Sequence, residues 1–100
     1  MNKADKQYLS SASALGCIAC YIQGTPGTPA EIHHPRDGAG IGQRSAHRRG
    51  IPLCPAHHRG TMHPAVPSIH QDKQRFIERF GTEAALVALV HQLIGVEDAA

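Results

Sequence analysis

The spacing of apolar side chains predicts a helix at the start of the chain. Between Lys3 and Leu15 the apolar residues fall three or four positions apart, which places them on one helical face (Ala4, Tyr8, Ala12 and Leu15). Gly16 is suited to end this helix, because glycine readily adopts the left-handed conformation found just after a helix. We therefore expect a packing helix over residues 3–15.

The last third of the chain predicts two further helices, within residues 68–95. Residues 68–71 (Ser-Ile-His-Gln) have the pattern of a capping box, so the first of these helices should start there and end at Gly81. Thr82 is suited to cap the second helix and Gly95 to end it. Apolar residues at helical spacing on both helices indicate core packing rather than contact with a cofactor (Phe76, Ile77, Phe80, Leu86, Leu89, Val90, Leu93 and Ile94).

Two short apolar pieces in the middle of the chain predict a pair of strands followed by a short helix. Residues 30–34 should form a strand that carries His33 and His34, and residues 51–53 an edge strand, because the second of them is proline. Pro55 suits the first turn of a helix that carries His57, His58 and Arg59.

The segment between these strands is rich in glycine, arginine and serine, which predicts an irregular loop over residues 35–50. A glycine-rich loop can bind phosphate, but no Lys-Ser/Thr pair follows it, so the sequence does not favour a P-loop. Five arginines and a single acid, Asp37, lie between Arg36 and His70. This local charge suits phosphate contacts and a solvated loop equally.

The length of 100 residues predicts one small domain over residues 1–100, with a thin, mostly aliphatic core because the chain has only four aromatic side chains. Such a domain gains stability from a bound metal. The sequence has no signal peptide, no long apolar run and no lipidation signal. We expect a soluble cytoplasmic protein without a membrane partner, in the host cytoplasm if it is phage-encoded.

The three cysteines predict a structural zinc site. Their odd number argues against a disulfide framework, and no thioredoxin-like strand and helix surround the Cys17-x-x-Cys20 pair. Cys54 and His57 have the same spacing, and together the four residues give a common Cys₃His ligand set. Three buried free cysteines are the alternative. If the helix starts elsewhere, the fourth ligand could instead be a later histidine (His58 or His63).

The histidines left over from this set suggest a second function. His33, His34, His47 and His58 lie in or beside the same predicted loop and helix. Neighbours on a strand point to opposite sides, so one of the adjacent His33 and His34 can bind a metal while the other acts as a base. An imidazole titrates near neutral pH, which suits it to take a proton from water.

With these residues the chain resembles a known family, the HNH nucleases of the His-Me finger (ββα-metal) class. The resemblance is carried by a His-His-Pro phrase on a first strand, a glycine-rich loop, and Leu-Cys-x-x-(Cys/His)-His entering a helix. Within that class it is most similar to the phage recombination-enhancement (Ref-type) nucleases. The closer similarity lies in Gly-Ile-Gly-Gln-Arg at residues 40–44, Ile-Pro-Leu-Cys-Pro-x-His-His-Arg at 51–59, and Ser-Ile-His…Phe…Arg-Phe-Gly within 68–81.

The resemblance implies a fold and a role for each matching residue. The fold would be α+β, with a zinc-stapled ββα-metal core over residues 17–63 and flanking N- and C-terminal helices. His33 and His58 would bind the catalytic metal, His34 would be the general base, and His47 would orient it. The structural zinc would be held by the remaining set (Cys17, Cys20, Cys54 and His57).

The third ligand of the catalytic metal is left open by the resemblance. Some histidine-rich members place it four residues beyond the last histidine of the motif, where this chain has Met62. His63 follows one residue later and His70 is a further candidate, although for His70 we favour a capping or packing role.

The implied activity is a metal-dependent DNA endonuclease that cuts or nicks with little sequence specificity. One divalent ion (Mg²⁺, Mn²⁺ or a later transition metal) would assist hydrolysis, and the arginines of residues 36–59 would hold the DNA backbone without reading bases. The expected partners are DNA and a recombinase filament, which Ref-type proteins engage through a long basic N-terminal extension. The alternative is a non-catalytic zinc module that binds nucleic acid or protein, and it leaves His33, His34 and His47 without a role.

Overall fold

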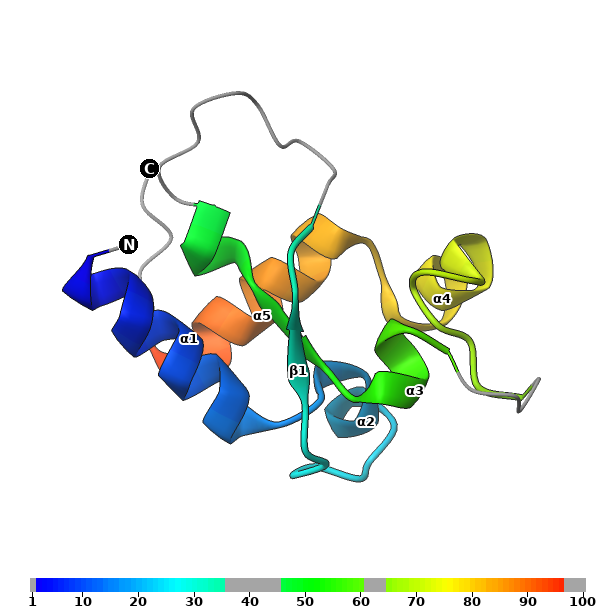
Figure 1. Ribbon diagram of the computed structural model, residues 1–100. Coiled ribbons are helices and arrows are strands. Elements are labelled where there is room, and N and C mark those ends of the chain that lie inside the picture. Colours follow the sequence, from blue (N-terminus) through cyan, green and yellow to red (C-terminus); the bar gives the residue numbers. More distant parts are fainter. Residues whose placement is uncertain (1, 36–45, 61–64, 97–100) are drawn as a thin grey trace.

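The computed structural model describes residues 2–35, 46–60 and 65–96, which form a small α+β structure, as expected (Figure 1). The elements follow in this order along the chain: α1 (Lys3–Leu15), α2 (Ile18–Ile22), β1 (Glu31–His33), the 3-10 helix η1 (Ala46–Arg49), β2 (Ile51–Leu53), α3 (Pro55–His58), α4 (Lys73–Phe80) and α5 (Glu83–Ile94). Among the described residues, no helix is long and apolar enough to cross a membrane.

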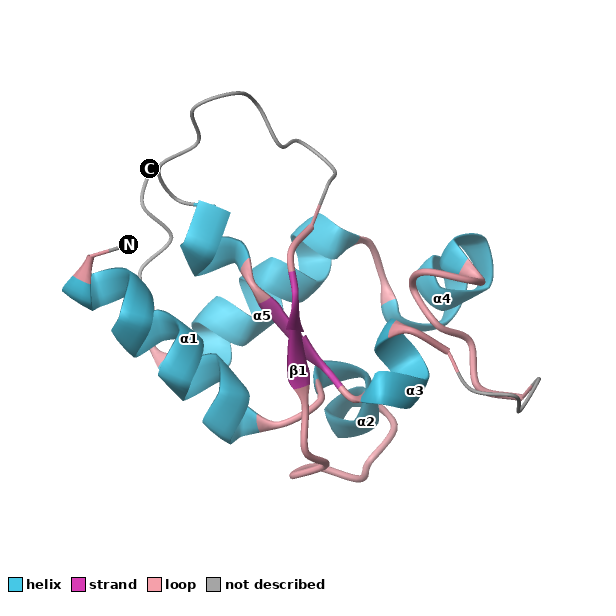
Figure 2. Cartoon of the chain, viewed as in Figure 1, coloured by secondary structure: helices cyan, strands magenta, loops and turns pink. Residues whose placement is uncertain are grey.

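The two predicted strands form an antiparallel ribbon (Figure 2). Ile32 lies opposite Pro52, and His33 lies opposite Ile51. Because side chains alternate along a strand, Glu31 and His33 share one face of β1 while Ile32 occupies the other. The ribbon has no third strand among the described residues, so Pro52 leaves no ladder hydrogen bond unmade in an interior strand.

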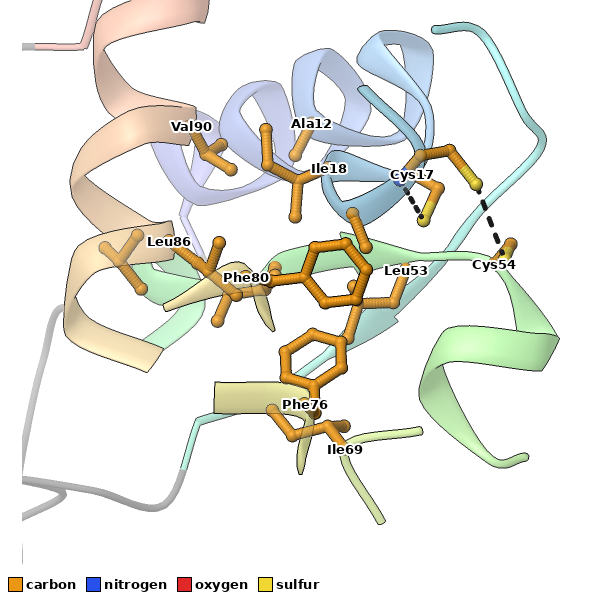
Figure 3. Close-up of a cluster of buried hydrophobic side chains, with 14 of the residues drawn as sticks. Ala12, Cys17, Ile18, Leu53, Cys54, Ile69, Phe76, Phe80, Leu86 and Val90 are labelled. Atoms are coloured by element: carbon orange, nitrogen blue, oxygen red, sulfur yellow. Dashed lines mark hydrogen bonds between the residues drawn. The ribbon is translucent and has the colours of Figure 1, made fainter. Parts of the chain in front are cut away.

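The core lies between this ribbon and the helices. Helices α1 and α5 pack side by side against the ribbon, and α3 lies on its other side (Figure 1). The rings of Phe76 and Phe80 of α4 are tilted by 50° with centroids 5.0 Å apart, and they lie within the apolar cluster (Figure 3). The remaining buried side chains are mostly aliphatic (Ala12, Ile18, Ile51, Leu53, Ile69, Leu86, Val87 and Val90). The expectation of a thin aliphatic core is confirmed.

Local signals account for the two helices that match their predicted limits. At the start of α1, the side chain of Asn2 accepts from the backbone of Asp5, and that of Asp5 accepts from the backbone of Asn2. The helix ends at Gly16, whose φ is 86°. Helix α5 begins after Thr82, which caps the Ala85 amide at 3.1 Å, and it ends at a left-handed Gly95.

The predicted start of α4 at residue 68 is wrong, because the helix begins at Lys73. The Ser68 hydroxyl does accept a hydrogen bond from the Gln71 amide, but the backbone there forms a turn. The amides of Ile69 and His70 donate to the carbonyls of the last two residues of α3, at 2.8 and 3.2 Å. These long-range bonds hold residues 68–71 against α3 and override the capping pattern.

The predicted irregular loop of residues 35–50 ends in the helical turn η1, which α1 and α5 hold in place. Tyr8 donates to the Gly50 carbonyl at 2.7 Å, and His91 donates to the Arg48 carbonyl at 2.6 Å. The Arg48 side chain pairs with the buried Asp5 at 3.1 Å. Residues 36–45 of this segment lie outside the described part of the chain.

Candidate metal centres

The four predicted zinc ligands come together in one buried cluster. Cys17 caps α2 and Cys20 lies within that helix, whereas Cys54 directly precedes α3 and His57 lies on it. Each of the four is at most 7% exposed, and all three cysteines are free of disulfides. Figure 3 shows Cys17 and Cys54 at one edge of the apolar core. The cluster therefore joins the two short helices that flank the strand ribbon.

The distances within this Cys₃His cluster match a tetrahedral metal site. The Nδ1 atom of His57 lies 3.6 Å from the Sγ atoms of Cys17 and Cys20, and 3.3 Å from that of Cys54. The Sγ atoms of Cys20 and Cys54 are 3.9 Å apart. Ligands of a tetrahedral zinc ion, at bonds of about 2.3 Å to sulfur and 2.0 Å to nitrogen, lie about 3.5–3.8 Å apart. The four residues can therefore hold a metal ion such as zinc.

Burial shifts the pKa values of two residues in this cluster in opposite directions. Burial raises the pKa of the Cys17 thiol to about 12, so an isolated thiol there stays protonated at neutral pH and a metal must displace the proton. Burial, together with the positive charge of Arg79, lowers the pKa of His57. His57 is thereby kept neutral, the form in which imidazole binds metals.

Three further histidines form a second cluster, which we call the histidine cluster: His33 of β1, His58 of α3 and His70 of the turn before α4. Their ring centroids lie 4.7–5.2 Å apart, and one nitrogen of each lies within 4.8 Å of the others. The Nε2 atoms of His58 and His70 are 3.1 Å apart. His33 is buried and His70 is exposed, so the cluster is open to solvent on one side.

A comparison with known protein families assigns the chain to one of them. The family model described as recombination enhancement, RecA-dependent nuclease matches residues 3–95. The chain belongs to this family. The resemblance to Ref-type nucleases is thus confirmed, and the family description places the chain among nucleases and in recombination.

Two carboxylates contact the histidine cluster. Glu31 Oε1 lies 2.7 Å from His58 Nδ1 and 2.8 Å from Arg59 Nε. Glu83 Oε2 lies 2.6 Å from His33 Nε2. The hydrogen bond from His58, with a smaller contribution from Arg59, lowers the pKa of Glu31. Burial lowers the pKa of His33, and Glu83 opposes that shift in part.

A small cavity of about 230 Å³ adjoins the histidine cluster. It is lined by His33, Ile69, His70, Lys73 and Glu83. The walls carry imidazole, ammonium and carboxylate groups, so the space suits a polar ligand rather than an apolar one.

The structure brings together some of the residues predicted for the active site. His33 and His58 lie together, and His70, for which the sequence favours a capping or packing role, lies with them. His34 is exposed and directly follows β1. His47 lies on η1, but its side chain is outside the described part of the structure, as is all of His63.

Sequence reasoning missed both carboxylates. Glu31 lies two positions before His33, and the strand alternation that separates His33 from His34 could have indicated that Glu31 shares the face of His33. No comparable pattern in the sequence indicates that Glu83 contacts the histidine cluster. An acid in the first turn of a capped helix is ordinary, because it interacts favourably with the helix dipole.

Proposed function

We propose that this nuclease is a metal-dependent DNA endonuclease of the HNH type, with the histidine cluster as its catalytic metal site. The observation that carries this proposal is the meeting of three imidazoles from β1, α3 and the turn before α4, next to a polar cavity and apart from the buried Cys₃His cluster. The order β1, β2, α3 agrees with a ββα-metal core. The Cys₃His cluster is proposed to hold structural zinc.

The ligand set would be His33, His58 and His70. When bound, a divalent ion would offset negative charge on the scissile phosphate and on the leaving 3′ oxygen. Three imidazoles favour a later transition metal in vitro, and Mg²⁺ and Mn²⁺ remain candidates in the cell. The half-open position of the cluster, with His33 buried and His70 exposed, would let a DNA phosphate reach it.

His34 is proposed as the general base. It is exposed and adjacent to His33, so it would take a proton from the attacking water beside the ion-binding residues. His47, carried on η1, would orient His34. The exposed side chains of Arg59 and Lys73 pair with Glu31 and Glu83 at the cluster and would hold the DNA backbone without reading bases.

The family description also bears on partners and on the alternative function. The description names the nucleases of this family as RecA-dependent, which supports a recombinase filament on DNA as the partner of this chain. The description also names the family as nucleases, which favours an enzyme over a non-catalytic zinc module. A non-catalytic module would not account for the three clustered imidazoles.

Replacing His34 with alanine tests the proposed base. We expect His34→Ala to lower the rate of plasmid cleavage by at least about 100-fold, since general base catalysis contributes that much. The zinc content should stay the same because His34 lies outside the Cys₃His cluster. Gln74→Ala, an exposed change on α4, is the control. Cleavage by His34→Ala at the parent rate would contradict the assignment.

A further inference from the structure

The two carboxylates at the histidine cluster each link different elements. Glu31 of β1 contacts His58 of α3, and Glu83 of α5 contacts His33 of β1. Helix α5 is otherwise a core helix, and its first residue is the point at which it reaches the cluster. Two of the three elements that carry the histidine cluster, β1 and α3, are therefore each contacted by an acid from another element.

These contacts determine which ring nitrogens carry a proton. A carboxylate only accepts, so His58 donates through Nδ1 and His33 donates through Nε2. The opposite nitrogens, His58 Nε2 and His33 Nδ1, are left with a lone pair. His58 Nε2 is 3.1 Å from His70 Nε2, which is close to the separation of about 3.0–3.4 Å expected for two ligands of one ion at bonds of about 2.1 Å. The lone pair of His58 therefore points to the place where an ion would lie.

Glu83 acts on His33 as a hydrogen-bond acceptor rather than as a fellow ligand. Its oxygen is 2.6 Å from His33 Nε2. Two ligands of one ion, at bonds of about 2.0 Å or longer, lie about 2.8 Å or more apart. The pair is thus too close to share an ion through these two atoms.

The fold keeps the Glu83 carboxylate at this place although burial of a charge is costly. Glu83 is only 1% exposed, and the start of α5 and the Lys73 ammonium, at 3.9 Å, offset its charge. Glu31 is more exposed and pairs with Arg59. Both acids therefore have a cation beside them as well as an imidazole.

We propose that Glu83 and Glu31 are positioning residues that fix the protonation and ring orientation of His33 and His58, and so strengthen divalent-ion binding by the histidine cluster. The proposal rests on the proposed function in one respect, the assignment of that cluster as the ion site. Carboxylates hydrogen-bonded to ligand histidines typically strengthen metal binding by about 10–100-fold.

Calorimetric titration of Mn²⁺ or Co²⁺ into the zinc-loaded protein tests this proposal. Glu83→Gln and Glu31→Gln keep the size of each side chain and remove its charge. We expect each to raise the dissociation constant of the second ion by about 10–100-fold, with zinc content unchanged. Glu78→Gln, which removes an exposed acid of α4, is the matched control and should bind as the parent does.

The outcomes separate this inference from the proposed function. Unchanged ion affinity in both glutamine variants, or an equal loss in Glu78→Gln, overturns the inference and leaves the nuclease proposal standing. Weaker ion binding in a protein that never cleaves DNA supports the inference and contradicts the function. A parent that binds no ion beyond zinc overturns both. If Glu83→Gln loses its fold and zinc, Glu31→Gln decides alone, because Glu31 is partly exposed.

Discussion

At the scale of single residues, two neighbouring histidines on α3 take part in different sites. His57 faces the three cysteines and packs its ring against Phe80, with centroids 5.1 Å apart. His58 contacts Glu31 and His70 instead. Adjacent helical positions are about 100° apart around the axis, which is enough to direct one ring into the core and the other toward His33 and His70.

The cysteine spacing and the His-His pairs were sufficient to predict most residues of the two clusters, because metal sites place strict demands on residue type and spacing. The choice of His57 rather than His58 for the Cys₃His cluster required the start of α3 to be known. Glu83 could not be predicted, since its role depends on where α5 packs against β1.

Loss of one cysteine should remove the structural metal. Cys54→Ser is expected to abolish stoichiometric zinc binding and to lower the free energy of unfolding by more than about 4 kcal/mol, as is typical when a structural metal is lost. Metal analysis and urea unfolding measure the two effects. Full zinc content with unchanged stability in Cys54→Ser would show that these cysteines are buried thiols and not ligands.

At the scale of elements, helices with complete local signals were predictable and those held by distant contacts were not. Periodic apolar residues and a terminal glycine predicted α1, and the same signals together with the Thr82 cap predicted α5. The start of α4 depends on backbone bonds from residues 69–70 to α3, which no local pattern reveals. The turn η1 likewise depends on Tyr8 and His91, which lie far from it in sequence.

The junction between α1 and α2 positions Cys17, the first residue of the Cys₃His cluster. Gly16 has a φ of 86°, and a Cβ atom there would lie 3.0–3.1 Å from the backbone of Gly27 and Thr28. The Thr28 carbonyl also accepts the amide of Cys17 at 2.9 Å. A side chain at Gly16 would therefore strain the backbone and press on the loop that holds Cys17.

Gly16→Ala should accordingly destabilise the protein more than Gly24→Ala. Gly24 has a similar φ of 95° but no atom within 4 Å of the added Cβ, so it isolates the cost of the backbone angle. We expect about 1 kcal/mol for Gly24→Ala and about 2–3 kcal/mol for Gly16→Ala, measured by urea unfolding of the zinc-loaded proteins. Equal losses in the two variants would show that crowding at this junction is unimportant.

At the scale of the whole molecule, the β1, β2 and α3 unit packs against the helices and contributes residues to both clusters that could hold a metal ion. The Cys₃His cluster fixes the start of α3, and the histidine cluster forms where α3 meets β1 and the turn before α4. The overall α+β class followed from the order of apolar segments in the sequence. The contact of His70 with His33 and His58 could not be predicted in that way, because it depends on how three elements are placed in space.

The arrangement also explains why one short chain can combine stability and catalysis. The buried cluster lies among apolar side chains and is shielded from solvent, whereas the histidine cluster is open on the side of His70 and Lys73. A zinc ion in the first site would hold the scaffold, and the second site would remain accessible to DNA.

The proposal that the histidine cluster is the catalytic metal site can be tested by measuring plasmid cleavage against divalent-ion concentration, for the parent and for His70→Ala. We expect no cleavage without an added ion, and a cleavage rate that saturates as the ion concentration is raised. In His70→Ala the half-saturating ion concentration should be at least about 10-fold higher, with zinc retained. Cleavage that persists in a chelator while zinc stays bound, or an ion dependence that His70→Ala leaves unchanged, would contradict it.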